Sequence, residues 1–490
     1  MKVYFVGIKG IGISALASYF KKTGNEVIGS DTKEKFYSEK ILKKYGIKYF
    51  EGFDKKNILK SHKEKSIDLV ISSAAYYDPK NIKTANPEIL AALSLNIPIK
   101  TYPQALAEIT NKLFTIGVSG SHGKSTTTGL VGLILESAGK DPLVLIGGKS
   151  KNWKSSIRIP EKRNKPVQYF VLEADEYREA FLNYNLKSLI INNIAFDHPD
   201  YYKTPASYEL AFKKLVKKIP RKGIIVGWGD DDKVRKIVNS ASAKKRFFGF
   251  NKGNDLVISN DRIVKQFQFF NLSWKNKNLG EFKIRFPGKS YLLDAAAASL
   301  MALELGVAPK AIKTALEKFL GISRRFDILL KAKNAPILVD DHALSPEQIK
   351  STLEAAKNFW PDKSIITVFQ PHTFTRTEAL MKDFAKSFGQ SDKVIVLDIY
   401  GSAREKNGKV SSKDLVNLAK SFHPQVKYLP TIEKAVSELK KNVFQDSKIN
   451  PGKIVIISLG CENVWRVPYT IKSTMYKKLK TKIKNIPNED

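Results

Sequence analysis

Residues 113–139 read LFTIGVSGSHGKSTTTGLVGLILESAG. The stretch opens with an apolar run, FTIGV, which predicts a β-strand, and closes with a segment to about Ser137 that predicts a helix. A turn containing Gly120 and Gly123 separates the two. Glycines let the backbone bend so that successive N–H groups point at phosphate oxygens, and the start of a helix adds a favourable dipole. The stretch therefore predicts a phosphate-binding turn.

The polar residues of this turn suit a nucleoside triphosphate. Lys124 would supply positive charge beside the β- and γ-phosphates, and Ser125 a hydroxyl ligand for Mg²⁺. The usual phosphate-loop spacing is not met, because Val118 occupies the first glycine position and the glycine sits one place earlier, at Gly117. The order of strand, loop and helix is nevertheless kept. The predicted phosphate site consists of Gly120, Ser121, His122, Gly123, Lys124, Ser125 and Thr126.

Polar side chains follow two later strand-like runs. Glu173 follows the run YFVL, with Asp175 and Glu176 just after it, and His198 comes after the run SLII. A phosphate loop needs an acidic residue at the end of a neighbouring strand, and Mg²⁺ takes oxygen ligands while keeping several waters. Ser125, Glu173 and His198 are therefore the candidate metal ligands. The alternatives are a salt-bridged strand end for Glu173 and a purely structural role for His198.

A second glycine-rich turn lies near the N-terminus, in VYFVGIKGIGISALASYF. Gly7, Gly10 and Gly12 open a predicted helix, and Asp31 closes the next strand-like run. The spacing is G-x-x-G-x-G, whereas dinucleotide-binding folds use G-x-G-x-x-G. The turn still offers backbone N–H groups to a pyrophosphate. Because only the later turn carries a lysine of the phosphate-loop type, the two turns suggest one nucleotide that is held and another that is consumed.

Strand-like and helix-like segments alternate along the chain, and the pattern restarts twice. The alternation predicts parallel sheets with crossover helices, so we expect an α/β fold with three domains in series. The restarts lie near residues 108 and 323. The predicted divisions are 1–108, 109–322, 323–466 and a lysine-rich tail, 467–490.

The chain is strongly basic. Its 83 Lys and Arg residues exceed its 48 Asp and Glu residues, which gives a net charge of +35. Such an excess favours anionic partners such as nucleotides, nucleic acid or a membrane surface, without choosing among them. The lysines are scattered along the chain, and no RNA-binding aromatic signature or zinc finger is present. We therefore interpret most of them as solvated surface residues and expect no nucleic-acid partner.

The composition also excludes several classes of protein. The single cysteine, Cys461, cannot form an internal disulfide, and with 6 histidines no Cys/His zinc cluster can be assembled. No run of about 18 apolar residues and no secretory leader are recognisable. We expect a cytoplasmic protein without a membrane span.

Seven segments, in this order and at these separations, resemble the Mur ligases. The likeness covers residues 1 to about 466, and within the family it is strongest to members that act on UDP-N-acetylmuramate and L-alanine. It implies a Rossmann-like first domain that binds the UDP-sugar through Gly7, Gly10, Gly12 and Asp31, a central P-loop ATPase-type domain, and a Rossmann-like third domain that closes over ATP. The segments are VGIKGIG, GSHGKSTTTG, EADEYREAFLNY, NNIAFDHPDYY, GISRRFD, VFQPHTFTRTE and DIYGSARE.

The resemblance also implies a reaction. The lactyl carboxylate of UDP-N-acetylmuramate takes the γ-phosphoryl group of ATP, and the amine of L-alanine attacks the acyl phosphate. The product is a peptidoglycan precursor, so the reaction serves cell wall biogenesis and, through it, cell shape and cell division. Lys124 and Mg²⁺ neutralise charge on the phosphoryl group.

Site residues follow from the same resemblance. Glu173 and His198 hold a second metal ion near the acyl phosphate. The two residues of QPHTFTRT that bind a carboxylate substrate are His372 and Arg376. A bidentate arginine suits that task. The further ATP-binding residues are Asn193, Arg325 and Asp341.

The chain departs from the family pattern at two places. Where D-D-Y-x-H-H-P is usual, residues 340–346 read DDHALSP, so Leu344 and Ser345 replace the two histidines. Where G-x-H-N or G-x-H-S is usual, Ser290 and Tyr291 follow Gly288-Lys289, and Asp294 stands at a later asparagine position. Both departures fall near the expected ATP site, so the chain could be a catalytically weakened homologue.

Three alternative hypotheses assign the chain another substrate or another class of protein. A ligase of the same fold could attach a preformed peptide, because EADEY and FDHPD also resemble that group. A nicotinamide-dependent oxidoreductase would use the first domain but leave the phosphate loop unexplained. A nucleic-acid binder would depend on the net charge and predicts salt-sensitive binding that survives loss of Lys124.

Overall fold

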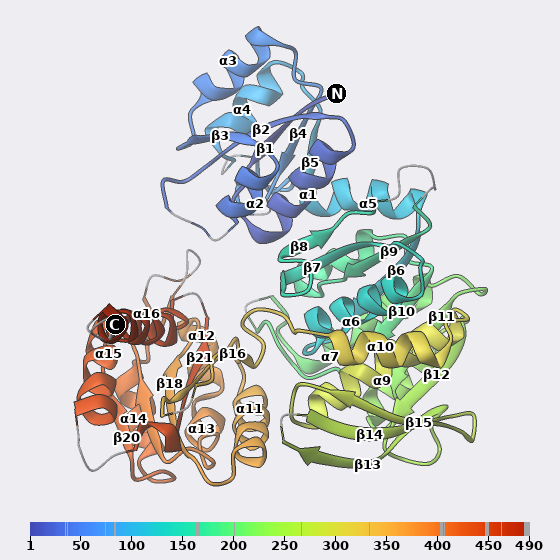
Figure 1. The fold of residues 1–490 in the computed structure, drawn as a ribbon. Coiled ribbons are helices and arrows are strands. Elements are labelled where there is room, and N and C mark those ends of the chain that lie inside the picture. Colours follow the sequence, from blue (N-terminus) through green and yellow to red (C-terminus); the bar gives the residue numbers. More distant parts are fainter. Residues whose placement is uncertain are drawn as a thin grey trace, which may run out of the picture.

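The structure is a computed structural model of the chain, and it shows three α/β domains in series (Figure 1). Each domain has its own sheet, so the predicted fold class is confirmed. The structure describes the chain with the exception of residues 35, 37, 74, 83–84, 162–166, 200, 266, 333, 402–404, 406, 446–449, 462 and 485–490, and of the side chains of 444–445 and 476–484. Residues 402–404 of the segment DIYGSARE and the end of the predicted tail lie outside the described residues.

The N-terminal domain contains a five-stranded parallel sheet in the order β3-β2-β1-β4-β5. The reversal of strand order between β1 and its neighbours is typical of Rossmann-like sheets. The strands are β1 (Lys2–Val6), β2 (Glu26–Asp31), β3 (Lys48–Glu51), β4 (Leu69–Ser72) and β5 (Ile99–Thr101). The helices are α1 (Ile11–Lys22), α2 (Glu39–Lys44), α3 (Lys55–Glu64), α4 (Pro87–Ser94) and α5 (Tyr102–Lys112).

The central domain is built on a ten-stranded mixed sheet in the order β15-β14-β13-β12-β11-β10-β6-β9-β7-β8. Strands β9 and β10 flank β6 as parallel neighbours, so the residues after all three strands meet at one edge. The strands are β6 (Phe114–Ser119), β7 (Leu143–Ser150), β8 (Ser155–Arg158), β9 (Tyr169–Glu173), β10 (Ser188–Ile191), β11 (Ile224–Trp228), β12 (Lys244–Gly249), β13 (Leu256–Val264), β14 (Phe267–Trp274) and β15 (Lys277–Ile284). The helices are α6 (Lys124–Ser137), α7 (Pro205–Lys218), α8 (Asp232–Asn239), α9 (Lys289–Glu304) and α10 (Pro309–Lys318).

The C-terminal domain has a six-stranded sheet in the order β16-β17-β21-β18-β19-β20, parallel except for β16. Its last helix contains most of the lysine-rich tail. The strands are β16 (Asp327–Leu330), β17 (Ile337–Asp341), β18 (Ser364–Gln370), β19 (Lys393–Val396), β20 (Val426–Tyr428) and β21 (Ile454–Gly460). The helices are α11 (Pro346–Phe359), α12 (Phe374–Ala379), α13 (Met381–Ala385), α14 (Ser412–Ala419), α15 (Ile432–Lys440) and α16 (Arg466–Lys484).

Several helices begin where a capping residue precedes a proline. Asn86 caps α4, Thr204 caps α7 and Ser345 caps α11, and each side chain accepts a hydrogen bond from a backbone N–H of the first turn. Proline at the next position fits because its missing N–H would have no partner in the first turn. These short signals fix where the three helices start.

Two apolar cores cross the domain boundaries. One extends from the central sheet around α6 and α9 to the strands β17, β18 and β21 of the C-terminal domain. Another joins the underside of the N-terminal sheet to β7, β9 and β10 of the central domain. Burial of apolar surface is the main stabilising term in folding. The two shared cores therefore pack the N-terminal and C-terminal domains against the central domain.

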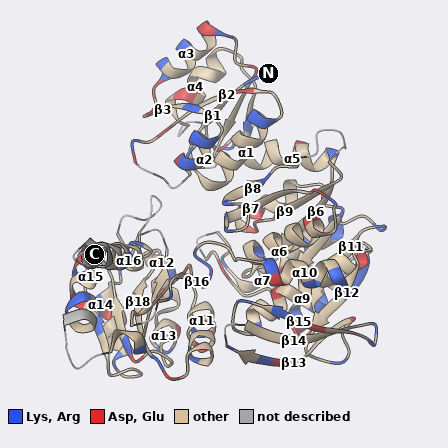
Figure 2. Cartoon of the chain, in the orientation of Figure 1, with Lys and Arg blue, Asp and Glu red and all other residues tan. Residues whose placement is uncertain are grey.

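The predicted strands are present, but the sequence pattern missed others. The antiparallel meander β13, β14 and β15 and the pair β7 and β8 were not predicted, nor were β3, β12, β16 and β20. The strands of the meander alternate buried residues with partly exposed ones, so they lack the continuous apolar run that marks a fully buried strand. Lys and Arg residues lie on all three domains and do not gather on one of them (Figure 2).

Among the described residues, no helix combines the length and the apolarity needed to cross a lipid bilayer.

Candidate functional site

The turn between β6 and α6 has the form of a phosphate loop. Gly120 and Gly123 have φ angles of +133° and +81°, which other residues rarely adopt. A Cβ atom on Gly123 would lie 2.3 Å from Oδ1 of Asp294. Helix α6 begins directly after the turn, at Lys124, and so includes Lys124, Ser125 and Thr126 in its first turn. The unpaired N–H groups of its first turn therefore face the space above the sheet edge.

Residues after β10 and from α9 hold this turn in place. The side chain of Asn193 accepts a hydrogen bond from the backbone N–H of His122 at 3.0 Å and donates one to its carbonyl at 3.1 Å. Asn192 donates to Oδ1 of Asp294 at 3.1 Å, and Thr127 donates to the same oxygen at 3.1 Å. Asn193, which was predicted to bind ATP, thus holds the loop through hydrogen bonds from its side chain to the backbone of His122.

Lys124 is paired inside the protein. Its Nζ donates to both carboxylate oxygens of Glu176, at 2.9 and 2.8 Å, and to the carbonyl of Gly120 at 2.7 Å. The Glu176 side chain is completely buried. Burial opposes ionisation of Glu176, but the charges of Lys124 and His198 outweigh it and lower its pKa. The buried carboxylate of Glu176 therefore holds the ammonium group of Lys124 beside the loop.

Ser125 and Glu173 meet beside the loop. The Ser125 hydroxyl donates to Oε1 of Glu173 at 3.1 Å, and the N–H of Gly147 donates to Oε2 at 2.6 Å. Two of the three predicted metal ligands are thus brought together, one on α6 and the other at the end of β9. Hydroxyl and carboxylate oxygens are suitable ligands for Mg²⁺.

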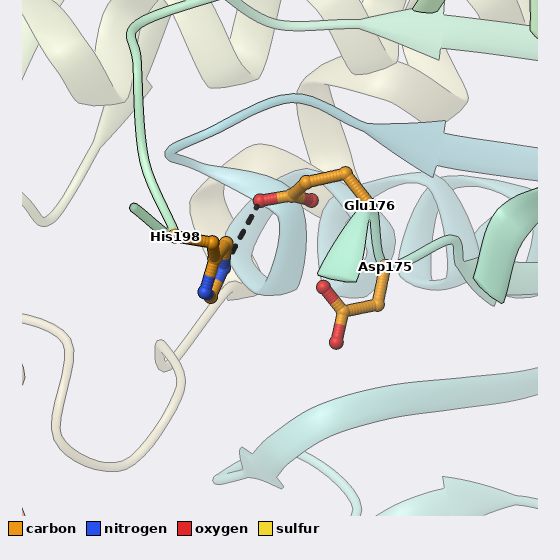
Figure 3. Close-up of side chains that lie close together, drawn as sticks. All are labelled: Asp175, Glu176 and His198. Atoms are coloured by element: carbon orange, nitrogen blue, oxygen red, sulfur yellow. Dashed lines mark ion pairs between the residues drawn. The ribbon is translucent and has the colours of Figure 1, made fainter. Parts of the chain in front are cut away.

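The third predicted ligand, His198, lies with two carboxylates to which the sequence pattern assigned no role. Its Nε2 lies 3.7 Å from Oε1 of Glu176 (Figure 3). Ligand atoms of Asp175, Glu176 and His198 lie within 4.8 Å of one another, which makes them a candidate metal group. The run EADE contained this signal, because Asp175 and Glu176 follow the strand that ends at Glu173.

A cavity of about 500 Å³ lies over the loop. Its walls come from the central and C-terminal domains. The aromatic residues Trp228 and Phe248, at the ends of the parallel strands β11 and β12, were not predicted, although their positions after apolar runs could have suggested them. The predicted residues that line it are Ser121, His122, Gly123, Lys124, Ser125, Thr126, Glu173, Asn193, Arg325 and Asp341.

The segments that depart from the family pattern lie on both sides of the cavity, residues 340–346 in the C-terminal domain and residues 288–294 in the central domain. Ser345 caps α11, and Gln348 in the same turn lies 3.0 Å from Nδ1 of His122 across the domain boundary. The Tyr291 hydroxyl donates to the carbonyl of Arg325 at 2.8 Å. Thr352 donates to Asp341 at 2.9 Å.

Ser290 and Asp294 also line the cavity. Both departures thus keep polar contacts at the cavity.

The two residues predicted to bind a carboxylate lie together at the same domain boundary. Nη1 of Arg376 is 3.3 Å from Nδ1 of His372. Nη2 of Arg376 donates to Oδ1 of Asp197 at 2.5 Å, across the boundary with the central domain. Burial opposes ionisation of Asp197, but Arg376 and His198 lower its pKa to about 2.

The N-terminal glycine turn is held from within its own domain. Asp31 is buried and accepts the backbone N–H of Lys9 at 2.6 Å, and the N–H of Gly7 donates to the carbonyl of Ser30. A Cβ atom on Gly12 would lie 2.7 Å from the Tyr102 hydroxyl. The structure therefore gives Asp31 a partner within the turn.

Family models match all three domains. The model described as "Mur ligase family, catalytic domain" matches residues 2–113, the "Mur ligase middle domain" matches 118–302, and the "Mur ligase, glutamate ligase domain" matches 324–458.

The chain is similar to curated enzymes over nearly its whole length. It is 34% identical to the UDP-N-acetylmuramate–L-alanine ligase of Desulfitobacterium hafniense over 95% of this chain and 98% of that one. It is 36% identical to the enzyme of that name from Alkaliphilus metalliredigens, over 95% of each.

Two solved structures give the same comparison in three dimensions. The UDP-N-acetylmuramate–alanine ligase of Thermotoga maritima superposes with a TM-score of 0.79 at 25% identity, covering 98% of this chain and 100% of that one. A murein peptide ligase from Psychrobacter arcticus superposes with a TM-score of 0.66 at 21% identity, covering 94% and 95%, and shares the fold.

The role of Asp294 beside the phosphate loop can be tested through the pH dependence of the protein's stability. Burial raises its pKa from 3.8 to about 8, so the folded protein holds a proton there that the unfolded chain releases near pH 4. The contribution of Asp294 to stability is therefore lost as the pH rises through this window. We expect Asp294→Asn, which keeps the accepting oxygen, to raise the melting temperature by a few degrees more at pH 8 than at pH 5.

The control is Asp261→Asn, at an exposed position of β13. Equal shifts of the Asp294→Asn melting temperature at the two pH values would contradict the assignment.

Proposed function

The chain belongs to the Mur ligase family, and from this premise we propose that it uses ATP to join L-alanine to the lactyl carboxylate of UDP-N-acetylmuramate. It is an ATP-dependent ligase that forms an amide bond, and its reaction belongs to the synthesis of peptidoglycan precursors and so to cell wall biogenesis. We place this activity in the cytoplasm, where the three substrates would meet.

The cavity over the β6–α6 turn is the observation that carries the proposal. It joins a phosphate loop and its lysine to polar groups from a second domain. Acyl activation by a triphosphate needs the phosphoryl donor, the carboxylate and the amine to be aligned with little water present. A site shared between two domains supplies such alignment when the domains close.

The chemistry proceeds in two steps. A lactyl carboxylate oxygen forms a bond to the γ-phosphorus of ATP, and the bond to ADP breaks. The amine nitrogen of L-alanine then bonds to the carbonyl carbon of the acyl phosphate, and inorganic phosphate leaves with the former carboxylate oxygen. Lys124 neutralises charge on the phosphoryl group, and the N–H groups at the start of α6 orient it.

The donor set beside the loop fits Mg²⁺. Ser125 and Glu173 would hold the ion that accompanies ATP, and His198 with Asp175 and Glu176 would hold a second one. A bound divalent ion would neutralise developing negative charge on phosphoryl oxygens. The protein itself contributes two fixed carboxylates at these positions, Glu173 at the end of β9, held by the N–H of Gly147, and Glu176 in the segment after it, held by Lys124.

The remaining assignments concern substrate binding. We propose that the N-terminal turn at Gly7, Gly10 and Gly12 binds the pyrophosphate of the UDP-sugar, with Asp31 fixing the shape of the turn. Asn193, Arg325 and Asp341 serve the ATP site, and His372 and Arg376 serve the carboxylate of the amino acid.

The proposal is tested by phosphate release from ATP in the presence of Mg²⁺ and UDP-N-acetylmuramate, with L-alanine, glycine, L-serine or a tripeptide added singly. We expect release to depend on UDP-N-acetylmuramate and to be fastest with L-alanine. Faster release with the tripeptide would favour the peptide ligase, and no release with any acceptor would overturn the ligase assignment.

Substitution of Lys124 tests the phosphate loop. We expect Lys124→Ala to lower the rate of phosphate release by at least about 100-fold, because a charge that is fixed beside the phosphoryl group is lost. The matched control is Lys217→Ala, an exposed lysine in the last turn of α7.

Because Lys124→Ala leaves Glu176 buried without its cation, the double variant Lys124→Ala/Glu176→Gln is measured with it, and thermal unfolding is followed for both. Retained turnover in a folded Lys124→Ala protein would remove the lysine from the mechanism.

Substitution of Glu173 tests the metal site. We expect Glu173→Gln to raise the Mg²⁺ concentration needed for half-maximal phosphate release by about tenfold or more, because a neutral amide is a weaker ligand than a carboxylate. Glu209→Gln, on α7, is the control. An unchanged Mg²⁺ titration for Glu173→Gln would show that Glu173 does not bind the ion.

A further inference from the structure

The outer face of the antiparallel meander in the central domain carries two aromatic rings. Strands β13, β14 and β15 pair in that order, with β14 in the middle. Side chains along a strand alternate between the two faces of its sheet. On β14, Gln268 and Phe270 are buried, whereas Phe267 and Phe269 are partly exposed. Helices α9 and α10 pack against the buried face, so the two phenylalanines lie on the opposite face (Figure 1).

Cations lie beside both rings. Phe269 stands directly opposite Arg262 on β13 and Lys283 on β15, so the three side chains share one face of the sheet. Cζ of Arg262 lies 5.3 Å from the centre of the Phe269 ring. Nζ of Lys283 and Cζ of Arg285 lie 5.5 and 5.2 Å from the centre of the Phe267 ring. The face therefore combines flat apolar rings with positive charge.

Two carboxylates offset part of this charge. Glu281 pairs with Arg262 at 2.6 Å, and Glu317 lies 3.7 Å from Lys283. The four side chains are between 35% and 52% exposed, and ion pairs that are this exposed are weak and screened by salt. Arg285 is exposed and forms no ion pair with a described residue. The cations of this face therefore remain available to a polyanion.

We propose that this face binds single-stranded RNA, with bases stacked on Phe267 and Phe269 and with phosphates paired to the neighbouring cations. An unpaired base offers a flat surface to an aromatic ring, and its phosphate supplies the negative charge that attracts an arginine or lysine beside that ring. An acidic peptide or an anionic membrane would supply the charge without flat groups that cover the two rings.

The proposed surface is separate from the ligase site. None of its two phenylalanines and three cations lines the cavity over the phosphate loop. The net charge of +35 adds to the attraction for RNA by raising the local concentration of a polyanion. The sequence pattern did not predict β13, β14 or β15, so the expectation of no nucleic-acid partner took no account of this face.

The test measures binding of the full chain to a fluorescently labelled oligouridine of about ten nucleotides, by fluorescence anisotropy at several salt concentrations. We expect binding to weaken as the salt concentration rises, because RNA phosphates release their counterions when they pair with the protein. At high salt, where charge contributes least, we expect an RNA duplex of the same length to bind more weakly, because its bases are stacked inside the helix.

The double variant Phe267→Ala/Phe269→Ala separates stacking from charge. We expect it to raise the Kd for the oligouridine by about tenfold or more, with the salt dependence unchanged, because the rings carry no charge. We expect Phe267→Trp/Phe269→Trp to bind as tightly as the wild type. Arg285→Gln is expected to reduce the slope of log Kd against log salt concentration by about 0.7.

The matched control is Phe422→Ala in the C-terminal domain. Phe422 is 49% exposed, and Nζ of Lys386 lies 5.4 Å from the centre of its ring. It therefore offers an exposed ring beside a cation on another surface, and we expect its loss to leave the Kd unchanged. Thermal unfolding and phosphate release, both expected to be unchanged, verify that the variants fold.

Five results would overturn the inference. The wild type does not bind the oligouridine, or the Kd rises equally in Phe422→Ala. The double alanine variant binds as well as the wild type, which would leave charge alone as the cause of binding. ATP displaces the oligouridine, which would place the RNA in the cavity over the phosphate loop. The double alanine variant loses binding to anionic lipid vesicles and keeps binding to the oligouridine, which would assign the face to a membrane.

The RNA-binding measurement and the phosphate-release assay fail independently. A wild type that binds the oligouridine without releasing phosphate would contradict the proposed ligase function and support the RNA-binding face. A wild type that releases phosphate without binding the oligouridine would do the reverse.

Discussion

The buried ion pair between Lys124 and Glu176 is the interaction on which the site depends. Two charges removed from water stabilise each other only while both are present, and the loss of one costs about 3–5 kcal/mol. The pair joins the turn after β6 to the segment after β9, and Glu176 also faces His198 in the loop after β10. Three neighbouring strand ends are thereby fixed together. A triphosphate that enters the cavity meets a lysine that is already oriented.

The sequence was sufficient for features that consecutive residues specify. The strand, glycine turn and helix of residues 113–139 are present, and α6 runs to Ser137 as expected. Glu173 was identifiable because it ends an apolar run. The grouping of Asp175 and Glu176 with His198 was not, since it depends on β9 and β10 both lying beside β6, an order that no local pattern specifies. The sequence likewise did not indicate that the side chain of Asn193 points at the backbone of the phosphate loop.

The departures from the family pattern show why a motif alone misjudges a site. Ser345 stands where a histidine is usual, yet it caps α11 and so fixes the position of Gln348, which meets His122 of the phosphate loop. Asp294 stands at an asparagine position and still accepts the hydrogen bonds of Asn192 and Thr127. A carboxyl group kept protonated by burial can serve as a neutral acceptor in place of an amide. The pattern marks which positions differ, and only the packing around them determines the consequence.

Two pairs of side chains that meet across the boundary between the central and C-terminal domains at this edge are Gln348 with His122 and Arg376 with Asp197. On the central side both partners lie in loops after parallel strands, and on the other side both lie in helices that follow parallel strands. The carboxyl ends of two sheets therefore face each other across the cavity. Interfaces between domains of one chain generally resemble transient protein interfaces, so each contact alone holds the domains weakly. A ligand that binds groups on both sides adds to the apolar packing that the two domains share, so its binding stabilises the arrangement in which the two sheet edges face each other.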